Sequence, residues 1–169
     1  MSEIQTINVN LSNLSEEEKE QLIKLVKKAN QKSKKRWRGE EDDHYYFISD
    51  CGEIQCDYEE KFDGDSYHYQ SGNYFKTEEE AEFELNRRLL YQELKDYALE
   101  HNEGEIDWKN SKQEKWVISY DNQIKCFTYL VRYVLSDIGQ IYFSSRKIAQ
   151  EAVKTVGKDR IKKYLFGVD

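Results

Sequence analysis

The sequence predicts an α+β fold, in which an N-terminal helix is followed by two related antiparallel ββ(β)α units. Apolar residues recur at helical spacing in three regions, and paired clusters of aromatic and β-branched residues flank short turns. One sequence pattern also occurs twice, because "GNYFKTEEEAEFEL" at 72–85 is similar to "GQIYFSSRKIAQEAV" at 139–153. We divide the chain into 1–38 (helix and basic linker), 39–104 (first, acidic unit) and 105–169 (second, mildly basic unit with a C-terminal helix).

The N-terminal helix is predicted from about Ser15 to Lys32. Ser15 is followed three residues later by Glu18, which is the pattern of a capping box, and an apolar stripe follows at helical spacing. A basic stretch comes next, with Lys32, Lys34, Lys35, Arg36 and Arg38. These cations suit a helix C-terminus and a solvated linker, or they form an arm that binds phosphates.

The first unit begins with a predicted β-hairpin. Residues 45–48 favour a strand, 50–52 supply the turn, and Ile54 starts the return strand. A second turn at 63–65 and a further strand ending at Phe75 should follow.

A helix should then start at the N-cap Thr77, with Glu80 completing a capping box, and run to about Glu100. Its predicted apolar face contains Ala81, Leu85, Leu89, Leu90, Leu94, Tyr97 and Ala98.

The second unit repeats this plan. A strand at 117–120 and a return strand at 124–131 flank a turn, a strand at 139–143 comes next, and Ser145 caps a helix that ends near Gly157. The apolar face of this helix contains Ile148, Ala149, Ala152, Val153 and Val156, and residues 158–166 form a short closing helix. Three pairs align at an offset of 68, namely Phe75 with Phe143, Thr77 with Ser145, and Ala81 with Ala149. We therefore expect an internal duplication.

Composition limits the class of protein. With 38% hydrophobic and 35% charged residues, the chain is too apolar to be disordered, and it has neither a membrane-length apolar run nor the pattern of a signal peptide. We expect a soluble, cytoplasmic protein whose three cysteines are reduced. The net charge of −7 is uneven, since 1–38 contributes +4, 40–65 contributes −10, 66–103 contributes −5 and 104–169 contributes +4.

Motifs for enzymatic chemistry are absent, so we expect a non-enzymatic protein without a cofactor. The sequence has no glycine-rich phosphate loop, H-E-x-x-H, G-x-S-x-G or CxxC pattern. A zinc site could be drawn from His44, Cys51, Cys56 and His68, but the spacing of paired ligands is missing, so free thiols are preferred. The run 63–65 resembles part of a calcium loop but lacks its distal ligand, so a turn is preferred.

The most informative chemistry is an acidic segment with interleaved tyrosines. The candidate partner-binding residues are Asp57, Glu59, Glu60, Asp63, Asp65, Tyr67 and Tyr69, with "EEDD" at 40–43 nearby. Such a segment is either a solvated sheet edge or a surface whose carboxylates imitate the phosphates of nucleic acid. The second interpretation predicts attraction to a basic, nucleic-acid-binding protein surface, with tyrosines as buried anchors.

The chain as a whole resembles a group of small phage and prophage accessory proteins of Gram-positive bacteria. The resemblance rests on "LSNLSEEEKEQLIKLVKKAN", Trp37, "YYFISDCGEI", "GNYFKTEEEAEFEL" and "YFSSRKIAQEAVKTVGKDRIKKYLFGV". Acidic phage proteins of this size often inhibit host defence, and anti-CRISPR proteins are the best-known kind. The resemblance implies a nucleic acid mimic that inhibits a host defence nuclease, a CRISPR effector, in the host cytoplasm. The alternatives are a nucleic-acid-binding regulatory protein, acting through the basic N-terminal segment and the second unit, and a component of the virion.

Overall fold

The computed structural model describes residues 14–30 and 36–168, and the chain divides into two compact parts, 1–37 and 38–169. The first part contains α1 (Glu16–Asn30). Its predicted capping box is confirmed, because Ser15 donates from N–H and Oγ to Glu18 Oε2 at 2.8 and 2.9 Å while Glu18 N–H donates to Ser15 Oγ at 3.3 Å. The described part of the helix reaches Asn30, and the predicted end at Lys32, together with Lys34 and Lys35, lies outside the described residues.

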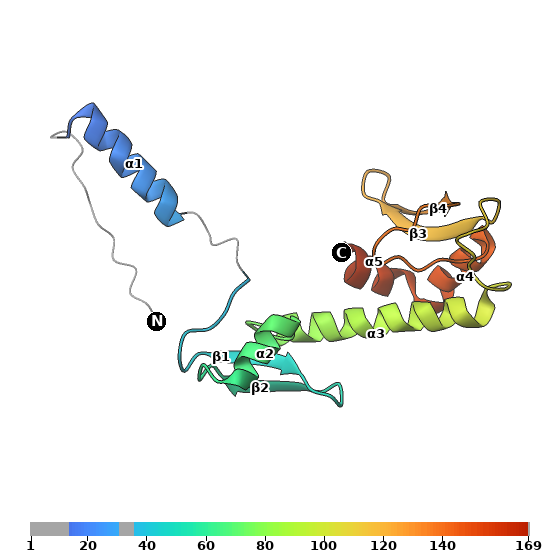
Figure 1. Ribbon diagram of the computed structural model, residues 1–169, viewed down its shortest axis with the longest axis horizontal. Coiled ribbons are helices and arrows are strands. Elements are labelled where there is room, and N and C mark those ends of the chain that lie inside the picture. The colour runs from blue at the N-terminus through green and yellow to red at the C-terminus, as the bar shows by residue number, and fades with distance from the viewer. Residues whose placement is uncertain (1–13, 31–35, 169) are drawn as a thin grey trace. The chain divides into compact units, whose positions relative to one another are not determined.

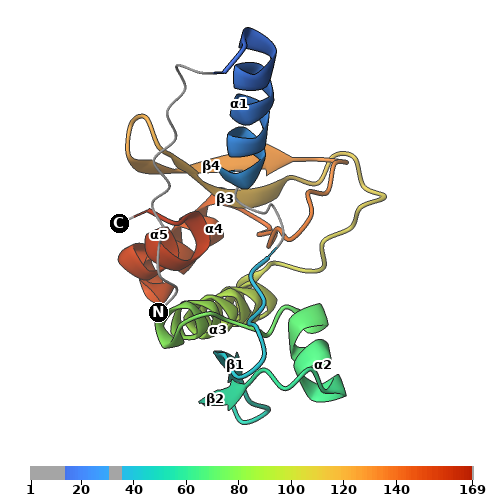
Figure 2. The same ribbon diagram turned by 90° about the vertical axis from the view of Figure 1, so that its left-hand side faces the viewer.

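The second compact part is a mixture of helices and small antiparallel sheets, which confirms the α+β class. Its elements in order are β1 (His44–Ile48), β2 (Ile54–Tyr58), α2 (Asp63–Ser71), α3 (Glu78–His101), β3 (Lys115–Asp121), β4 (Cys126–Arg132), α4 (Arg146–Val156) and α5 (Lys158–Phe166). Figures 1 and 2 show the first hairpin and α2 on one side of α3 and the second hairpin, α4 and α5 on the other. In Figure 1 the first hairpin and α2 lie at the N-terminal end of α3, the second hairpin and α4 over its C-terminal half, and α5 over its middle, where Arg160 pairs with Glu93. No helix among the described ranges is long and apolar enough to cross a membrane.

Both predicted hairpins are confirmed, although the second return strand begins at Cys126, two residues later than predicted, because the turn covers 122–125. β1 pairs with β2 in a register that places Tyr46 opposite Cys56, and β3 pairs with β4 with Trp116 opposite Val131. The third strand predicted in each unit is wrong. Instead, Phe75 and Phe143 each form one isolated antiparallel bridge, to Tyr46 and Trp116, through reciprocal hydrogen bonds of 2.8 to 2.9 Å.

The segment 63–71 is a helix, where a turn and the start of a strand were expected. The Asp65 carboxylate caps it, since Oδ2 accepts the N–H groups of Glu60 and Phe62 at 3.0 Å. Gly72 ends the helix in the left-handed conformation at φ 80°, and its N–H donates to backbone carbonyls of the last turn. The capping carboxylate of Asp65 and the left-handed Gly72 together favour a helix over an extended chain in this segment.

The predicted N-caps of α3 and α4 are confirmed, although Glu80 does not complete the predicted capping box, because its carboxylate accepts the N–H of Lys76 at 3.0 Å instead of that of Thr77. The Oγ1 of Thr77 accepts the N–H of Glu80 at 3.3 Å at the start of α3, and Ser145 Oγ accepts the N–H of Ile148 at 3.3 Å at the start of α4. Gly157 is the C-cap of α4 and also precedes α5. On α3 the prediction is wrong at Leu89, which is 54% exposed.

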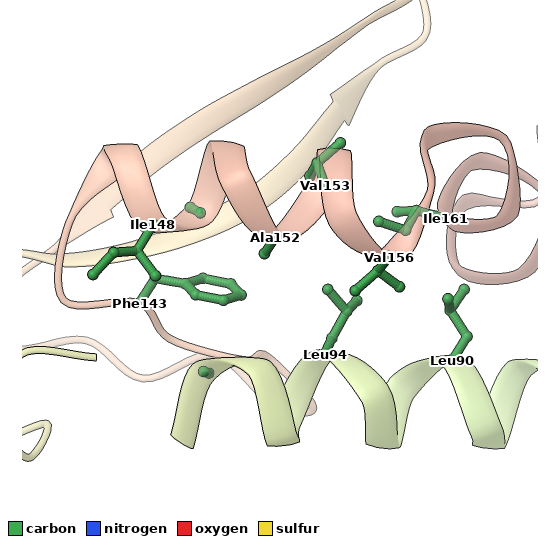
Figure 3. Close-up of a cluster of buried hydrophobic side chains, with 10 residues drawn as sticks. Leu90, Leu94, Phe143, Ile148, Ala152, Val153, Val156 and Ile161 are labelled. Carbon is green, nitrogen blue, oxygen red and sulfur yellow. The ribbon is translucent and has the colours of Figure 1, made fainter. Parts of the chain in front are cut away.

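The main hydrophobic core lies between α3, α4 and α5 (Figure 3). Phe143, Ala149, Ala152 and Ile161 have no exposed surface, and Leu90 of α3 is equally buried. Full burial of a valine, leucine, isoleucine or phenylalanine side chain contributes about 1.5 to 3 kcal/mol and that of an alanine less, so this cluster is the principal source of stability in the second compact part. The predicted apolar face of α4 is confirmed at all five positions.

A buried lysine fastens the second hairpin. Lys115, which has no exposed surface, donates from Nζ to the carbonyls of Asn110, Gln113 and Tyr133 at 3.2, 3.1 and 2.8 Å. Three ammonium donors therefore meet three acceptors, and the Trp108 ring lies 5.2 Å from the nitrogen. The lysine joins the loop before β3 to the end of β4.

Candidate functional site

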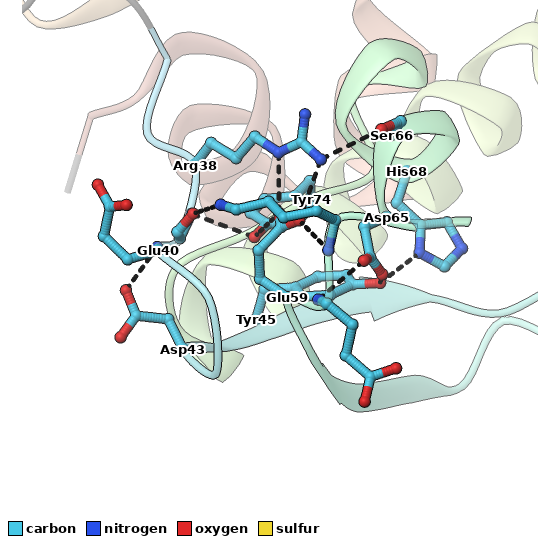
Figure 4. Close-up of polar contacts among 12 residues, drawn as sticks. Arg38, Glu40, Asp43, Tyr45, Glu59, Asp65, Ser66, His68 and Tyr74 are labelled. Carbon is cyan, nitrogen blue, oxygen red and sulfur yellow. Dashed lines mark hydrogen bonds and ion pairs between the residues drawn. The ribbon is translucent and has the colours of Figure 1, made fainter. Parts of the chain in front are cut away.

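Glu59 lies at the centre of a buried polar network at the end of β2 (Figure 4). Arg38 binds both of its carboxylate oxygens, from Nε at 2.8 Å and Nη2 at 3.0 Å. The Tyr74 hydroxyl donates to Oε2 at 2.9 Å, and the Lys61 N–H donates to Oε1 at 3.1 Å. The Arg38 hydrogen bonds, helped by Tyr74 and opposed by burial, lower the pKa of Glu59 to about 2.

Asp65 forms a second buried centre beside the first. Its Oδ1 accepts the Tyr45 hydroxyl at 3.0 Å, and the His68 Nδ1 lies 2.9 Å from the same hydroxyl. Burial, followed by the hydrogen bond to Asp65, raises the pKa of Tyr45 above its usual range. The Tyr45 and Tyr74 rings stack at 4.0 Å, and burial raises the pKa of Tyr74 to about 12.

The network joins segments that are distant in sequence. Tyr74 Oη accepts the Gly39 N–H at 3.1 Å, Lys61 Nζ donates to the Gly39 carbonyl at 2.9 Å, and Arg38 Nη2 donates to Ser66 Oγ at 3.2 Å. A Cβ at Gly39 would lie 2.9 Å from the Cβ of Asp43, so this close approach requires glycine. Every carboxylate oxygen of Glu59 and Asp65 accepts at least one hydrogen bond from within the chain, so both side chains stabilise this part of the fold.

The same network gathers exposed carboxylates at one end of the first hairpin. The Asp42 N–H donates to the Glu59 carbonyl at 3.0 Å, and the Glu59 N–H donates to the Asp43 carbonyl at 2.9 Å, which holds 40–43 beside the end of β2. Seven exposed acidic residues result, which we call the acidic surface: Glu40, Glu41, Asp42, Asp43, Asp57, Glu60 and Asp63.

Exposed aromatic residues accompany the acidic surface. Tyr58, Phe62 and Tyr67 are 51%, 66% and 67% exposed. Tyr58 ends β2 next to Asp57, while Phe62 precedes α2 and Tyr67 lies within it. Large exposed aromatic side chains next to spaced carboxylates are suited to protein recognition, since aromatic residues are enriched in the buried cores of protein interfaces.

The predicted partner-binding residues divide into three groups by exposure. Asp57, Glu60, Asp63 and Tyr67 are exposed. Glu59 and Asp65 are instead buried, and we remove them from the predicted surface because their carboxylates already bind groups of the chain itself. Tyr69 is half-buried, with its ring 5.7 Å from Tyr74 and 5.4 Å from the Arg38 guanidinium.

The predicted basic arm is only partly described. Arg36 is exposed. The Arg38 guanidinium forms an ion pair with buried Glu59 and is therefore less available to bind a phosphate. Lys32, Lys34 and Lys35 fall outside the described residues, so the structure neither supports nor opposes their role.

The residues considered for metal binding do not converge. Within 14–30 and 36–168, no three His, Cys, Asp or Glu side chains form a group that could hold a metal ion. Cys56 Sγ lies 3.5 Å from His44 Nδ1, while His68 interacts with Tyr45 and Cys51 is exposed in the hairpin turn. The sequence 63–65 begins α2 and is not the turn that was predicted.

Comparison with protein families, with curated proteins and with solved structures found no match to this chain.

Proposed function

We propose that the acidic surface binds a basic, nucleic-acid-binding surface of a partner protein. The observation that supports this proposal is the grouping of seven exposed carboxylates and three exposed aromatic residues around one buried network. On the resemblance to phage accessory proteins, the partner is a host defence nuclease, a CRISPR effector, and the chain is its non-enzymatic inhibitor in the host cytoplasm.

The physical basis is preorganised electrostatic complementarity. Carboxylates spaced over one surface present a row of negative charge, which accelerates encounter with a basic groove and opposes binding to acidic proteins. Because the Glu59 network fixes 40–43, the end of β2 and the start of α2 together, little conformational entropy is lost when a partner binds. The same negative charge disfavours direct contact between this surface and the phosphate backbone of nucleic acid.

The test is a charge reversal restricted to exposed positions. The variant Asp57→Lys/Glu60→Lys/Asp63→Lys changes the acidic surface and leaves Glu59 and Asp65 intact. We expect it to fold and to lose inhibition of DNA cleavage by purified CRISPR effector nucleases of Gram-positive bacteria, together with binding to them in biolayer interferometry. The matched control is Glu100→Lys/Glu103→Lys/Glu105→Lys, which reverses three exposed charges elsewhere and should leave both activities unchanged. Equal inhibition by both variants, or none by the natural protein, would refute the proposal.

The alternative function is nucleic-acid binding through the basic N-terminal segment and the second unit. The engagement of Arg38 by Glu59 removes one cation from that segment, so we prefer the acidic surface. A gel shift with duplex and single-stranded DNA at low salt separates the two functions, since strong binding that falls steeply with added salt would favour the alternative.

We also propose that the two ββα units arose by internal duplication. In each unit a residue of the first strand, Tyr46 or Trp116, forms an isolated bridge to a phenylalanine, Phe75 or Phe143. A hydroxyl two residues later caps the next helix, and an alanine four residues beyond it, Ala81 or Ala149, has no exposed surface. These equivalent roles support a common origin.

A further inference from the structure

The outer edge of β4 has no partner strand among the described residues. Trp116 exchanges both of its backbone hydrogen bonds with Phe143, so its polar groups point away from β4. Val131, opposite Trp116, must therefore point its N–H and C=O away from β3, and alternation gives Phe127 and Tyr129 the same orientation. These residues present a short row of backbone donors and acceptors to the outside, in which the Val131 carbonyl already accepts a hydrogen bond from Arg132 Nη1 at 3.3 Å.

This edge lacks the features that usually prevent strand addition. β4 reads "CFTYLVR" and has one charged residue, Arg132, which lies at its end and pairs with Asp137 at 2.9 Å. β2, the outer strand of the first hairpin, instead contains Asp57 within the strand. Natural edges are commonly protected by charges, proline or bulges, and β4 is without them over six consecutive residues.

A basic hollow lies against the face of the second hairpin that carries Phe127 and Tyr129 of β4. It has a volume of about 390 Å³ and is lined by these two residues, by Tyr120 of β3 and by the first turns of α5. Its charged residues are Lys125, Lys158, Lys162 and Asp159, so cations outnumber anions by three to one. Lys158 and Lys162 are four residues apart on α5 and lie on the same face of that helix.

We infer that β4 and this hollow, together the β4 groove, bind an extended acidic peptide segment of a partner protein. The peptide adds as a strand to the outward-facing N–H and C=O groups of Phe127 and Tyr129 and to the N–H of Val131, whose carbonyl already accepts a hydrogen bond from Arg132 Nη1 at 3.3 Å. Alternate side chains of the added strand then face the hollow, where carboxylates meet Lys158 and Lys162. This site is separate from the acidic surface and has the opposite charge.

Two other occupants are less suitable. Single-stranded nucleic acid would use the lysines, but it cannot satisfy a row of strand hydrogen bonds, and the Phe127 and Tyr120 rings already pack near Phe166 at 6.2 and 5.9 Å. A second copy of the chain would bring its own β4, which contains no carboxylate, and a second set of the same lysines. Only an acidic strand complements both the backbone edge and the charge.

The experiment is a selection of displayed random peptides of about ten residues on the full chain. We expect enrichment of sequences with Asp or Glu at alternating positions. A synthetic peptide from that pool should bind about tenfold more weakly to Lys158→Glu/Lys162→Glu, as expected when two attractive charge contacts become repulsive. The matched control Lys109→Glu/Lys154→Glu reverses two exposed lysines outside the groove and should retain the affinity of the natural protein. Circular dichroism and thermal unfolding establish that both variants fold.

Backbone pairing is tested separately with N-methylated versions of the selected peptide. Because only alternate N–H groups of an added strand face β4, methylation of one alternating set should abolish binding and methylation of the other should not. The inference is overturned if no acidic peptides are enriched, if both methylated sets bind equally, or if the groove variant binds as well as the control. It is also overturned if an oligothymidine displaces the peptide at comparable concentration, which indicates a nucleic-acid site, or if sedimentation shows a dimer that the peptide dissociates.

Discussion

Replacing Glu59 with glutamine tests whether the buried network holds the first hairpin together. The natural carboxylate accepts two hydrogen bonds from Arg38, one from Tyr74 and one from the Lys61 backbone. In Glu59→Gln, the amide NH₂ group must face one of these donors, and the Arg38 guanidinium loses its counter-charge. Breaking one partner of a buried pair is costly because the remaining charge is left uncompensated.

The expected cost follows from the pKa of Glu59. The pKa is lowered from 4.5 to about 2, and each unit is equivalent to about 1.4 kcal/mol, so the ionised group stabilises the folded state by about 3 kcal/mol. Since the folded pKa lies below the unfolded value, this stabilisation is fully present above about pH 5 and is lost as the pH falls through the folded pKa. About half should remain at pH 3, and less than about 1 kcal/mol at pH 2.

Urea unfolding of the natural protein and of Glu59→Gln, measured at several pH values, provides the assay. With an m value of about 1.5 kcal/mol/M, the midpoint should fall by about 2 M at neutral pH. The difference between the two proteins should narrow below about pH 4, because other carboxylates titrate equally in both and cancel. Glu60→Gln, an exposed neighbour, is the control and should change stability by less than about 0.5 kcal/mol. A difference that is independent of pH, or no larger than that of the control, would refute the reasoning.

Three further changes examine tyrosine ionisation, core packing and helix capping. Because the folded pKa of Tyr74 is about 12 against an ordinary 10, its neutral hydroxyl stabilises the fold below pH 10, and this contribution disappears as the pH rises through 12. Ultraviolet titration should show a late phenolate fraction that decreases in Tyr74→Phe; uniform ionisation near 10 contradicts the burial. Ala81→Leu and Ala149→Leu should each destabilise the protein by about 1 to 3 kcal/mol in thermal unfolding, since neither site has exposed surface, and an unchanged melting temperature would show spare room. Ser145→Ala should cost about 1 kcal/mol and Ser145→Gly only a few tenths, so equal losses would argue against a capping role.

Local chemistry explains which elements were predictable from the sequence. The starts of α1, α3 and α4 each have a hydroxyl residue whose oxygen accepts an N–H three positions later, and such a contact depends on neighbours in sequence. The hairpin turns and the apolar face of α4 are likewise local patterns. α2 was missed because Phe62 occupies its N-cap position and cannot accept a hydrogen bond, while Asp65 performs the capping from within the helix.

The burial of Glu59 depends on contacts that local pattern does not encode. Its main partner, Arg38, is 21 residues earlier, and Tyr74 is 15 residues later. In a segment with eleven acidic residues, nothing in the immediate sequence distinguishes the buried carboxylates from the exposed ones. Leu89 illustrates the same limit on a helix, because a continuous apolar stripe need not be covered continuously by other elements. The sequence therefore predicted that this segment is acidic, but only the three-dimensional structure shows which of its carboxylates are exposed and form the acidic surface.

The length of α3 sets a fixed geometric relation between the two hairpins. Its N-terminal Ala81 is buried near the first hairpin, and its Leu94 is buried against the second half of the fold, thirteen residues or about 20 Å farther along the axis. A helix of this kind fixes both the distance between the two hairpins and their relative rotation about its axis. Inserting one residue within the exposed stretch 86–89 would turn one hairpin by about 100° relative to the other, whereas inserting seven would lengthen the spacing by about 10 Å and nearly restore the relative rotation. A ligand that contacts both hairpins would lose the alignment of its two contact sites after the first insertion and would have to span a longer distance after the second.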